Sequence, residues 1–290
     1  MLFGRLQKPV KRATVILVLL LGCFYLPSMT HGQALAPISI KDPSLLAGKS
    51  SARATDYDGV LALLGPVLRE EFGLPVSQVK LFLYPNREAF EAHLVNIVRF
   101  DPVYAREVAG WAVAVGAPEM VLANEEALER ISWSERIRVL AHELVHTVQY
   151  GLAGGRRGTS DQWLREGFAD WIAYRVLESL DLEKASIRQA LLLARIKGTA
   201  RRLSCAPLSE MVTLKDFMKL RARVGGSAIY SQCFLAVDLL VKQHGVQRVV
   251  DYFSLFGRSD DRLGNFRAVF GQDLPAFEKE YLAYLQDELR

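Results

Sequence analysis

The chain has 290 residues, of which 50% are hydrophobic and 23% are charged. This composition is typical of a folded globular protein and excludes a disordered chain. Four of the 36 basic residues precede residue 13, so the remaining basic residues balance the 32 acidic ones. The body of the chain is therefore close to neutral, without the basic surplus that marks nucleic-acid-binding proteins.

The first 34 residues have the organisation of an export signal. An apolar run over residues 13–26 follows four basic side chains, Arg5, Lys8, Lys11 and Arg12. The run is shorter than the roughly 18 residues of a membrane span and matches the core of a signal peptide. Three forms remain open: a signal cleaved near Gly32-Gln33-Ala34, a lipid on Cys23, or an uncleaved membrane anchor. All three predict export to the periplasm or the extracellular space, with or without membrane attachment.

Residues 35–55 are rich in Ala, Pro, Ser and Gly and are predicted to be a linker. Beyond them, hydrophobic spacing predicts a helix from Asp56 or Asp58 to Phe72, a strand over residues 79–84 and a helix from Asn86 to Val98.

Two further strands, Trp111–Val115 and Met120–Ala123, are predicted to flank a turn at residues 116–118. A strand directly before the next helix is a candidate edge for an extended peptide. A plain core hairpin is the alternative.

From residue 132 onward the predicted elements are helical. Ser132-x-x-Glu135 predicts the start of one helix, and a second is expected from Ser160 or Asp161 to about Leu180. Six more are expected, at about 182–197, 209–221, 226–243, 245–256, 260–270 and 275–289. The sequence therefore predicts an α+β fold: a small N-terminal mixed sheet with helices, followed by a helical C-terminal half. Cys205 and Cys233 are compatible with a disulfide or with two free thiols.

The helix that Ser132 opens contains His142-Glu143-Leu144-Val145-His146. Each helical residue turns the direction by about 100°, so the two histidines share one face and can bind one Zn²⁺. Glu143 lies beside that face, where it can take a proton from water. The alternative is a buried helix with two chance histidines, because this short motif also occurs in unrelated proteins.

A catalytic zinc typically has three protein ligands and one open position. Glu166 follows His146 by twenty positions, at the start of the next helix, so the intervening loop can bring it back to the metal. Asp170 lies one turn after Glu166, and we expect it to accept the free ring N–H of His142.

The His142–His146 motif together with Trp163-Leu164-Arg165-Glu166-Gly167-Phe168-Ala169-Asp170 resembles the gluzincin metallopeptidases. Within these it is most similar to the bacterial peptidase MA-like domains, and more distantly to the thermolysin group. The resemblance covers roughly residues 56–288 and is weaker in its flanks, at Tyr230, His244-Gly245 and Phe270-Gly271.

The resemblance implies a zinc site and an activity. Zn²⁺ would be bound by His142, His146 and Glu166, with Glu143 as the general base in the hydrolysis of a peptide bond. Tyr230 would steady the oxyanion, and a core tyrosine is the alternative.

The sequence thus predicts an exported zinc metallopeptidase that acts on a peptide or protein substrate, with residues 56–290 as its catalytic domain. One alternative is a catalytically silent, exported or membrane-attached zincin-fold binding protein. Another is a membrane-attached interaction protein whose helical tail is the active part. The complete set of His142, Glu143, His146 and Glu166 favours the enzyme, because loss of activity commonly removes Glu143 or a ligand. Substrate-binding residues, specificity and oligomeric state are not predicted.

Overall fold

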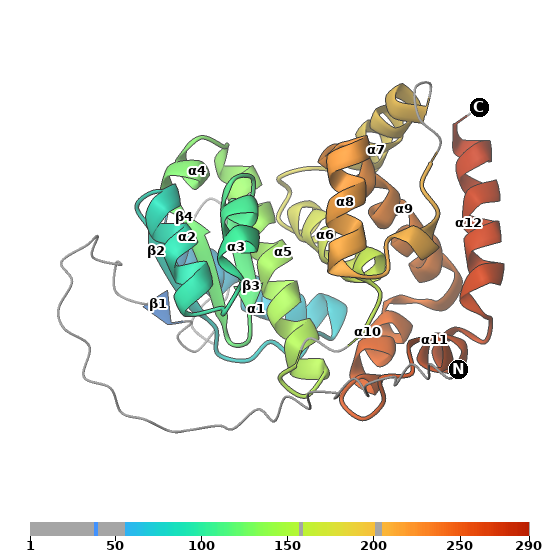
Figure 1. Cartoon of the computed structure of the whole chain (residues 1–290), viewed down its shortest axis with the longest axis horizontal. Coiled ribbons are helices and arrows are strands. Elements are labelled where there is room, and N and C mark those ends of the chain that lie inside the picture. Colours follow the sequence, from blue (N-terminus) through green and yellow to red (C-terminus); the bar gives the residue numbers. More distant parts are fainter. Residues whose placement is uncertain (1–37, 40–55, 157–158, 201–204, 290) are drawn as a thin grey trace, which may run out of the picture. The chain divides into compact units, whose positions relative to one another are not determined.

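The computed structural model describes residues 38–39, 56–156, 159–200 and 205–289. Within them a mixed sheet has the strand order β1-β2-β4-β3 (Figure 1). β2 and β4 pair in parallel, whereas β1 with β2 and β3 with β4 pair antiparallel. The strands are β1 (Ile38–Ser39), β2 (Lys80–Tyr84), β3 (Ala114–Ala117) and β4 (Met120–Asn124). β3 therefore forms one edge of the described sheet.

The predicted α+β fold is confirmed, with a small mixed sheet followed by a helical C-terminal half. The export signal predicted over residues 1–34 lies outside the described residues, as does most of the linker predicted over residues 35–55. Along the part of the chain that is described, no helix combines the length and the apolar character needed to cross a membrane.

Short polar side chains start the helices around the sheet. Asp56 caps α1 by accepting the N–H of Gly59 at 2.7 Å, and Asn86 caps α2 in the same way. The loss of such a cap typically costs about 1 kcal/mol. α1 ends at Gly73, whose φ of 65° is in the left-handed region that glycine adopts without strain. The helices of this half are α1 (Tyr57–Phe72), α2 (Arg87–Asn96), α3 (Pro102–Ala109) and α4 (Glu125–Glu129).

The strand predicted at Trp111–Val115 is wrong in its first half. Helix α3, which Asp101 caps and which was not predicted from the sequence, occupies the preceding residues. The N–H groups of the next residues, Trp111 and Ala112, both donate to Val108 O, at 3.0 and 2.8 Å. These residues therefore complete the turn after α3. Asn124 of β4 donates its N–H to the Val113 carbonyl oxygen, and β3 itself begins at Ala114.

The turn between β3 and β4 lies later than predicted. Gly116 and Ala117 remain in the strand, opposite Val121 and Met120 of β4. The reversal falls on the next two residues, where Glu119 adopts a positive φ of 58°.

The two helices with the sequence motifs are α5 (Trp133–Leu152) and α6 (Gln162–Ser179). The six predicted C-terminal helices correspond to observed ones, with bounds that agree within five residues. They are α7 (Ala185–Ala200), α8 (Leu214–Val224), α9 (Gly226–His244), α10 (Val246–Leu255), α11 (Arg262–Phe270) and α12 (Leu274–Glu288), with a short 3-10 turn at Leu208–Glu210.

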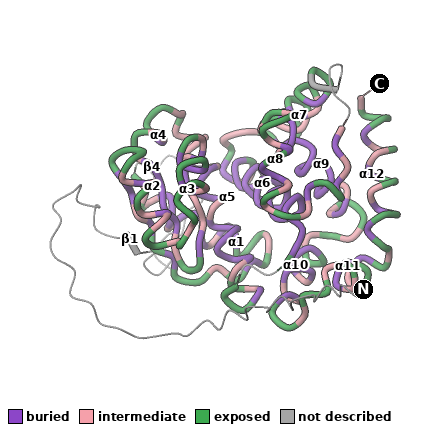
Figure 2. The backbone as a smooth tube through the Cα atoms, in the orientation of Figure 1, coloured by how far each residue is buried: buried purple, intermediate pink, exposed green. Residues whose placement is uncertain are grey.

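α5 packs against β3 and β4 on one side and against α6 on the other (Figure 1). Most of α5, α6 and α9 is buried, whereas α7 and α12 keep an exposed face (Figure 2). The far side of α5 is seated in the main core by Ile137, Leu140, Leu144 and Val148, all buried. Burial of such side chains contributes about 1.5–3 kcal/mol each.

α6 and α9 approach each other backbone to backbone at Gly167. A Cβ atom at this position would lie 2.2 Å from the carbonyl oxygen of Cys233 on α9. Only glycine permits this approach. Because Gly167 directly follows Glu166, the contact holds α9 close to this metal ligand candidate. Both Cys205 and Cys233 are free thiols.

Candidate metal centre

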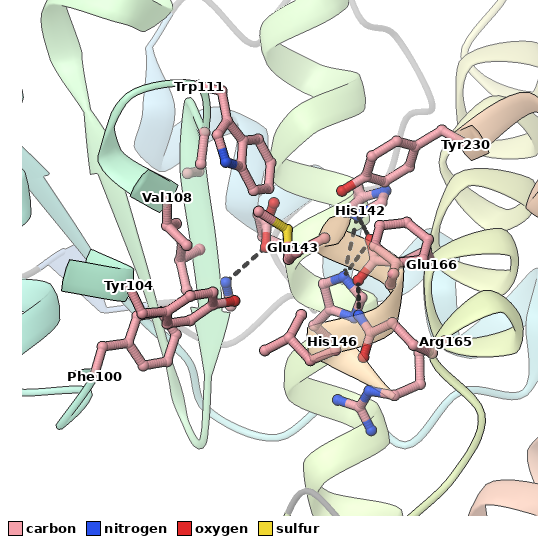
Figure 3. A pocket seen from close by; sticks show the side chains of 18 of the residues that line it. Phe100, Tyr104, Val108, Trp111, His142, Glu143, His146, Arg165, Glu166 and Tyr230 are labelled. Atoms are coloured by element: carbon pink, nitrogen blue, oxygen red, sulfur yellow. Dashed lines mark hydrogen bonds and ion pairs between the residues drawn. The ribbon is translucent and has the colours of Figure 1, made fainter. Parts of the chain in front are cut away.

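His142 and His146 of α5 converge with Glu166 of α6. Their ligand atoms all lie within 4.8 Å of one another, and all three residues are buried. The two Nε2 atoms are 3.1 Å apart, and Glu166 Oε2 lies 3.4 Å from that of His142 and 3.6 Å from that of His146. Figure 3 shows the three side chains pointing toward one another.

These separations fit a tetrahedral metal. With zinc–ligand bonds of about 2.0–2.1 Å, two ligand atoms lie about 3.3 Å apart. Each of the three separations falls within a few tenths of an ångström of that value. The described residues therefore form a possible metal site with two imidazoles and one carboxylate.

The other ring nitrogens indicate which tautomer each histidine adopts. His142 Nδ1 lies 2.9 Å from Asp170 Oδ1, and His146 Nδ1 lies 2.8 Å from Gln149 Oε1. Both partners are acceptors, so both Nδ1 atoms carry the proton and donate it. The Nε2 lone pairs are then directed at one point beside the Glu166 carboxylate. Two such lone pairs repel each other unless a cation lies between them, so the donor set fits a metal ion.

Two glutamines hold this cluster in place. Gln149 accepts from His146 and donates its own Nε2–H to the carbonyl oxygen of Arg165 at 3.0 Å, which ties α5 to α6. Gln162 donates to Glu166 Oε1 at 2.5 Å and so leaves the other oxygen, Oε2, on the histidine side. The orientation of His146 and of Glu166 is thus fixed by amides from both helices.

Asp170 is itself held by an arginine. Arg138 Nη1 lies 3.4 Å from the same Oδ1 that His142 contacts, and its Nε donates to Glu135 at 2.7 Å. Arg188 of α7 donates to the other oxygen of Glu135 at 2.7 Å. A chain of alternating charges therefore runs from α7 to the metal centre. Glu135 also shows only half of the predicted capping box: its N–H donates to Ser132 Oγ, while its carboxylate binds the arginines.

The electrostatics of the cluster favour a positive charge at its centre. Burial would lower the pKa of His142, but the charge of Asp170 and hydrogen bonds to Asp170 and Glu166 raise this pKa to about 10. Burial would raise the pKa of Glu166, but the two histidines lower it well below its ordinary value. A metal ion supplies this charge without a proton on the imidazole.

Glu143 lies on the sheet side of the site. Its Oε2 accepts the backbone N–H of Gly116 of β3 at 2.6 Å (Figure 3). Burial raises the pKa of this carboxyl, against the lowering effect of the two histidines. A Cβ at position 116 would lie 2.4 Å from the carbonyl oxygen of Glu143 and 2.9 Å from His146 Cβ. The absence of a side chain at Gly116 therefore lets β3 reach the general-base candidate.

Two adjoining pockets form a cleft at the site. The α3–α8 pocket is lined by side chains of α3 and α8, among them Tyr104, Val108, Phe217 and Met218. The α7–α9 pocket is lined by side chains of α7 and α9, among them Leu192, Arg195, Ser227 and Ser231. Both pockets share several lining residues: Trp111, Ala112, Ala114, His142, Glu143 and Tyr230.

Tyr230, the predicted oxyanion residue, comes from α9 and lies across the cleft from Trp111 (Figure 3). It is partly buried and packs edge-on against Phe217 at 5.4 Å between ring centroids. Burial raises its pKa well above the ordinary value, and the charge of Glu166 acts in the same direction. The hydroxyl group therefore keeps its proton and is a donor.

Four residues of this arrangement were not predicted from the sequence: Gly116, Arg138, Gln149 and Gln162. The two glutamines carried a usable signal, because each lies one helical turn from a ligand on its own helix. Gly116 and Arg138 carried none, because their roles depend on the contact of α5 with β3 and α6.

No protein-family model, no curated protein and no solved structure matches this chain. The character of the site therefore rests on its geometry: a buried cluster of two histidines and one glutamate, consistent with a zincin-like motif.

Proposed function

We propose that the protein is a zinc-dependent metallopeptidase of the gluzincin kind. The observation that carries this proposal is the convergence of three donor atoms, from His142, His146 and Glu166, on one point beside the partly buried carboxylate of Glu143. Two imidazoles with one carboxylate are a common donor set for catalytic zinc, which keeps a fourth position open.

A bound Zn²⁺ would polarise the scissile carbonyl and lower the pKa of a water molecule. Glu143 would then take a proton from the attacking water and deliver it to the leaving amine. Its hydrogen bond to the Gly116 N–H supports this role, because it fixes the orientation of the carboxylate. Tyr230 would donate its hydroxyl proton to the oxyanion in a hydrogen bond.

The edge of β3 supports a peptide as the substrate. An extended peptide can add to an exposed strand edge through backbone hydrogen bonds. Ala114, Val115 and Gly116 of this strand line the α3–α8 pocket beside the site. Export of the protein, through the signal predicted over residues 1–34, is part of the same proposal and would place the enzyme outside the cytoplasm.

Two measurements test the proposal. Metal analysis of the purified protein should find one zinc per chain, and the zinc-loaded protein should hydrolyse a broad peptide library. Glu143→Ala should retain the zinc and lose the hydrolysis. If wild type and Glu143→Ala hydrolyse the library equally well, the proposed role of Glu143 is wrong. If neither hydrolyses it, the peptidase proposal is wrong and the catalytically silent binding protein becomes the better description.

A further inference from the structure

Arg221 of α8 stacks on Trp111, a residue that lines both pockets of the cleft. The guanidinium carbon lies 3.9 Å from the centroid of the indole ring. Trp111 belongs to the segment before β3, so this contact joins the two sides of the cleft. A stacked arginine and an aromatic ring attract each other, but the stack provides no hydrogen-bond acceptor.

Both partners bury a donor that has no acceptor. Arg221 Nε and Trp111 Nε1 are each inaccessible to solvent and without a hydrogen-bond partner. Among the described residues, the Arg221 guanidinium also has no carboxylate within ion-pair distance. Buried donors of this kind are unfavourable unless a partner arrives. Within the described part of the chain, the two terminal nitrogens of the Arg221 guanidinium are without a partner too but are not sealed from solvent, so a ligand with acceptor oxygens can bind Arg221 there.

Arg221 also lies beside the start of α9. A Cβ on Gly226 would be 3.1 Å from Arg221 Nε, and the next residue, Ser227, lines the α7–α9 pocket. α9 begins there without a side-chain cap, so its first N–H groups and its helix dipole add positive potential. The charge of Arg221 reaches Tyr230 as well: it partly offsets the rise in pKa that burial causes.

The charges around the cleft favour an anionic ligand. Among the described residues, the two pockets are lined by three arginines, Arg138, Arg165 and Arg195, and by three carboxylates, Glu143, Glu166 and Asp170. The charges of these six side chains sum to zero. Arg221 adds one positive charge, and a bound zinc would add two more. The net charge around the cleft is then positive, and a neutral peptide would leave this charge uncompensated.

We propose that Arg221 binds a carboxylate of the substrate, next to Trp111 and the first turn of α9. This inference rests on the proposed peptidase function and specifies its substrate: a peptide with a carboxylate close to the scissile bond. A guanidinium holds a carboxylate through two parallel N–H···O bonds, which a lysine does not reproduce. The carboxylate has two sources, the C-terminus of the peptide or an Asp or Glu side chain. The first source would make the protein a carboxypeptidase-type exopeptidase.

Binding and cleavage of matched peptides test this assignment. The probes are N-terminally fluorescent hexapeptide libraries made as free acids and as C-terminal amides, with and without Asp and Glu at the random positions. Kd is measured by anisotropy on the full chain with Glu143→Gln, loaded with zinc, and cleavage is measured on wild type. We expect a free carboxylate to tighten binding about 10- to 100-fold.

The variants separate the role of Arg221 from that of general charge. Arg221→Gln should abolish the preference for the carboxylate, and Arg221→Lys should restore only part of it. Arg223→Gln is the matched control, because Arg223 lies on the same helix but is exposed and paired with Glu210. If Arg221→Gln does not fold, as judged by circular dichroism, Arg221→Lys and Trp111→Phe give the answer. Trp111→Phe keeps an aromatic ring at this position but removes the indole N–H.

Each result has one interpretation. A preference for free acids over amides assigns the C-terminal carboxylate, and a preference for acidic residues in both forms assigns a side chain. Equal affinity for all libraries, or a preference that persists in Arg221→Gln, overturns the inference while leaving the peptidase proposal intact. If wild type cleaves no peptide, the peptidase proposal fails, and the anisotropy comparison still decides whether Arg221 binds a carboxylate.

Discussion

Gly116 donates its backbone N–H to the carboxylate of Glu143 across 2.6 Å, from a position where any side chain would collide with α5. The same residue thus both orients the general-base candidate and permits β3 to lie against the metal helix. Replacing one of its two Cα hydrogens by a methyl group would affect both functions together.

Gly116→Ala should therefore reduce activity and stability. The new Cβ would lie 2.4 Å from the carbonyl oxygen of Glu143, which is backbone and cannot turn away. Overpacking of this kind costs about 1–3 kcal/mol, and a displaced β3 would release Glu143. Thermal unfolding and kcat/KM on a peptide library measure the two effects. Gly151→Ala is the control, because a Cβ there meets no atom within 4 Å, and it should be neutral or stabilising.

Asp170→Ala should weaken zinc binding by about 10- to 100-fold, because His142 would lose the acceptor that fixes its ring. Competition with a chelator of known affinity measures this change. Asp273→Ala removes the N-cap of α12, far from the site in sequence, and should cost stability without changing zinc affinity. Equal zinc affinity of Asp170→Ala and wild type would remove Asp170 from the site.

Gln149 should orient His146 in the same way as Asp170 orients His142. Gln149→Leu removes the acceptor for His146 Nδ1 and the donor to the Arg165 carbonyl, so we expect zinc affinity to fall about 10- to 100-fold. Gln149→Glu keeps an acceptor of similar shape and should bind zinc more tightly than Gln149→Leu. The same chelator competition ranks the two variants, and the opposite order would contradict the proposed tautomer of His146.

The Glu135 cluster should contribute to stability in a pH-dependent way. Burial would raise the pKa of Glu135, but the charges and hydrogen bonds of Arg138 and Arg188 lower it below its ordinary value. Because the folded pKa is the lower one, the contribution is present above the unfolded pKa of about 4.3 and is lost as the pH falls through the folded value.

Urea unfolding of wild type and Glu135→Gln at several pH values measures this contribution. The difference in the free energy of unfolding should be largest near neutral pH and should shrink below about pH 4.3. Glu126→Gln, which breaks the exposed pair with Arg130, is the control and should change little at any pH. A difference for Glu135→Gln that grows on acidification would contradict the direction of the pKa shift.

The sequence predicted those parts of the site that depend on helical spacing. His142 and His146 share a face because they lie four residues apart, and Glu166 and Asp170 do so for the same reason. Some of the features that were not predicted depend on local sequence and others on tertiary contacts. Helix α3 is a local one, because Asp101 and Pro102 are a typical helix start and could have indicated it. Arg221 could not be found, because its stack on Trp111 joins residues 110 positions apart.

The close contact of Gly167 with the Cys233 carbonyl has a consequence for mutational tolerance. Where two helices meet through their backbones, their spacing does not depend on the volume of any side chain. Substitutions in the core around α6 and α9 should therefore change how much of the protein is folded before they change the distance between Glu166 and Tyr230. A library of variants in the core around α6 and α9, selected for folding alone, should keep glycine at position 167. Most of the variants that fold should still have an intact metal centre.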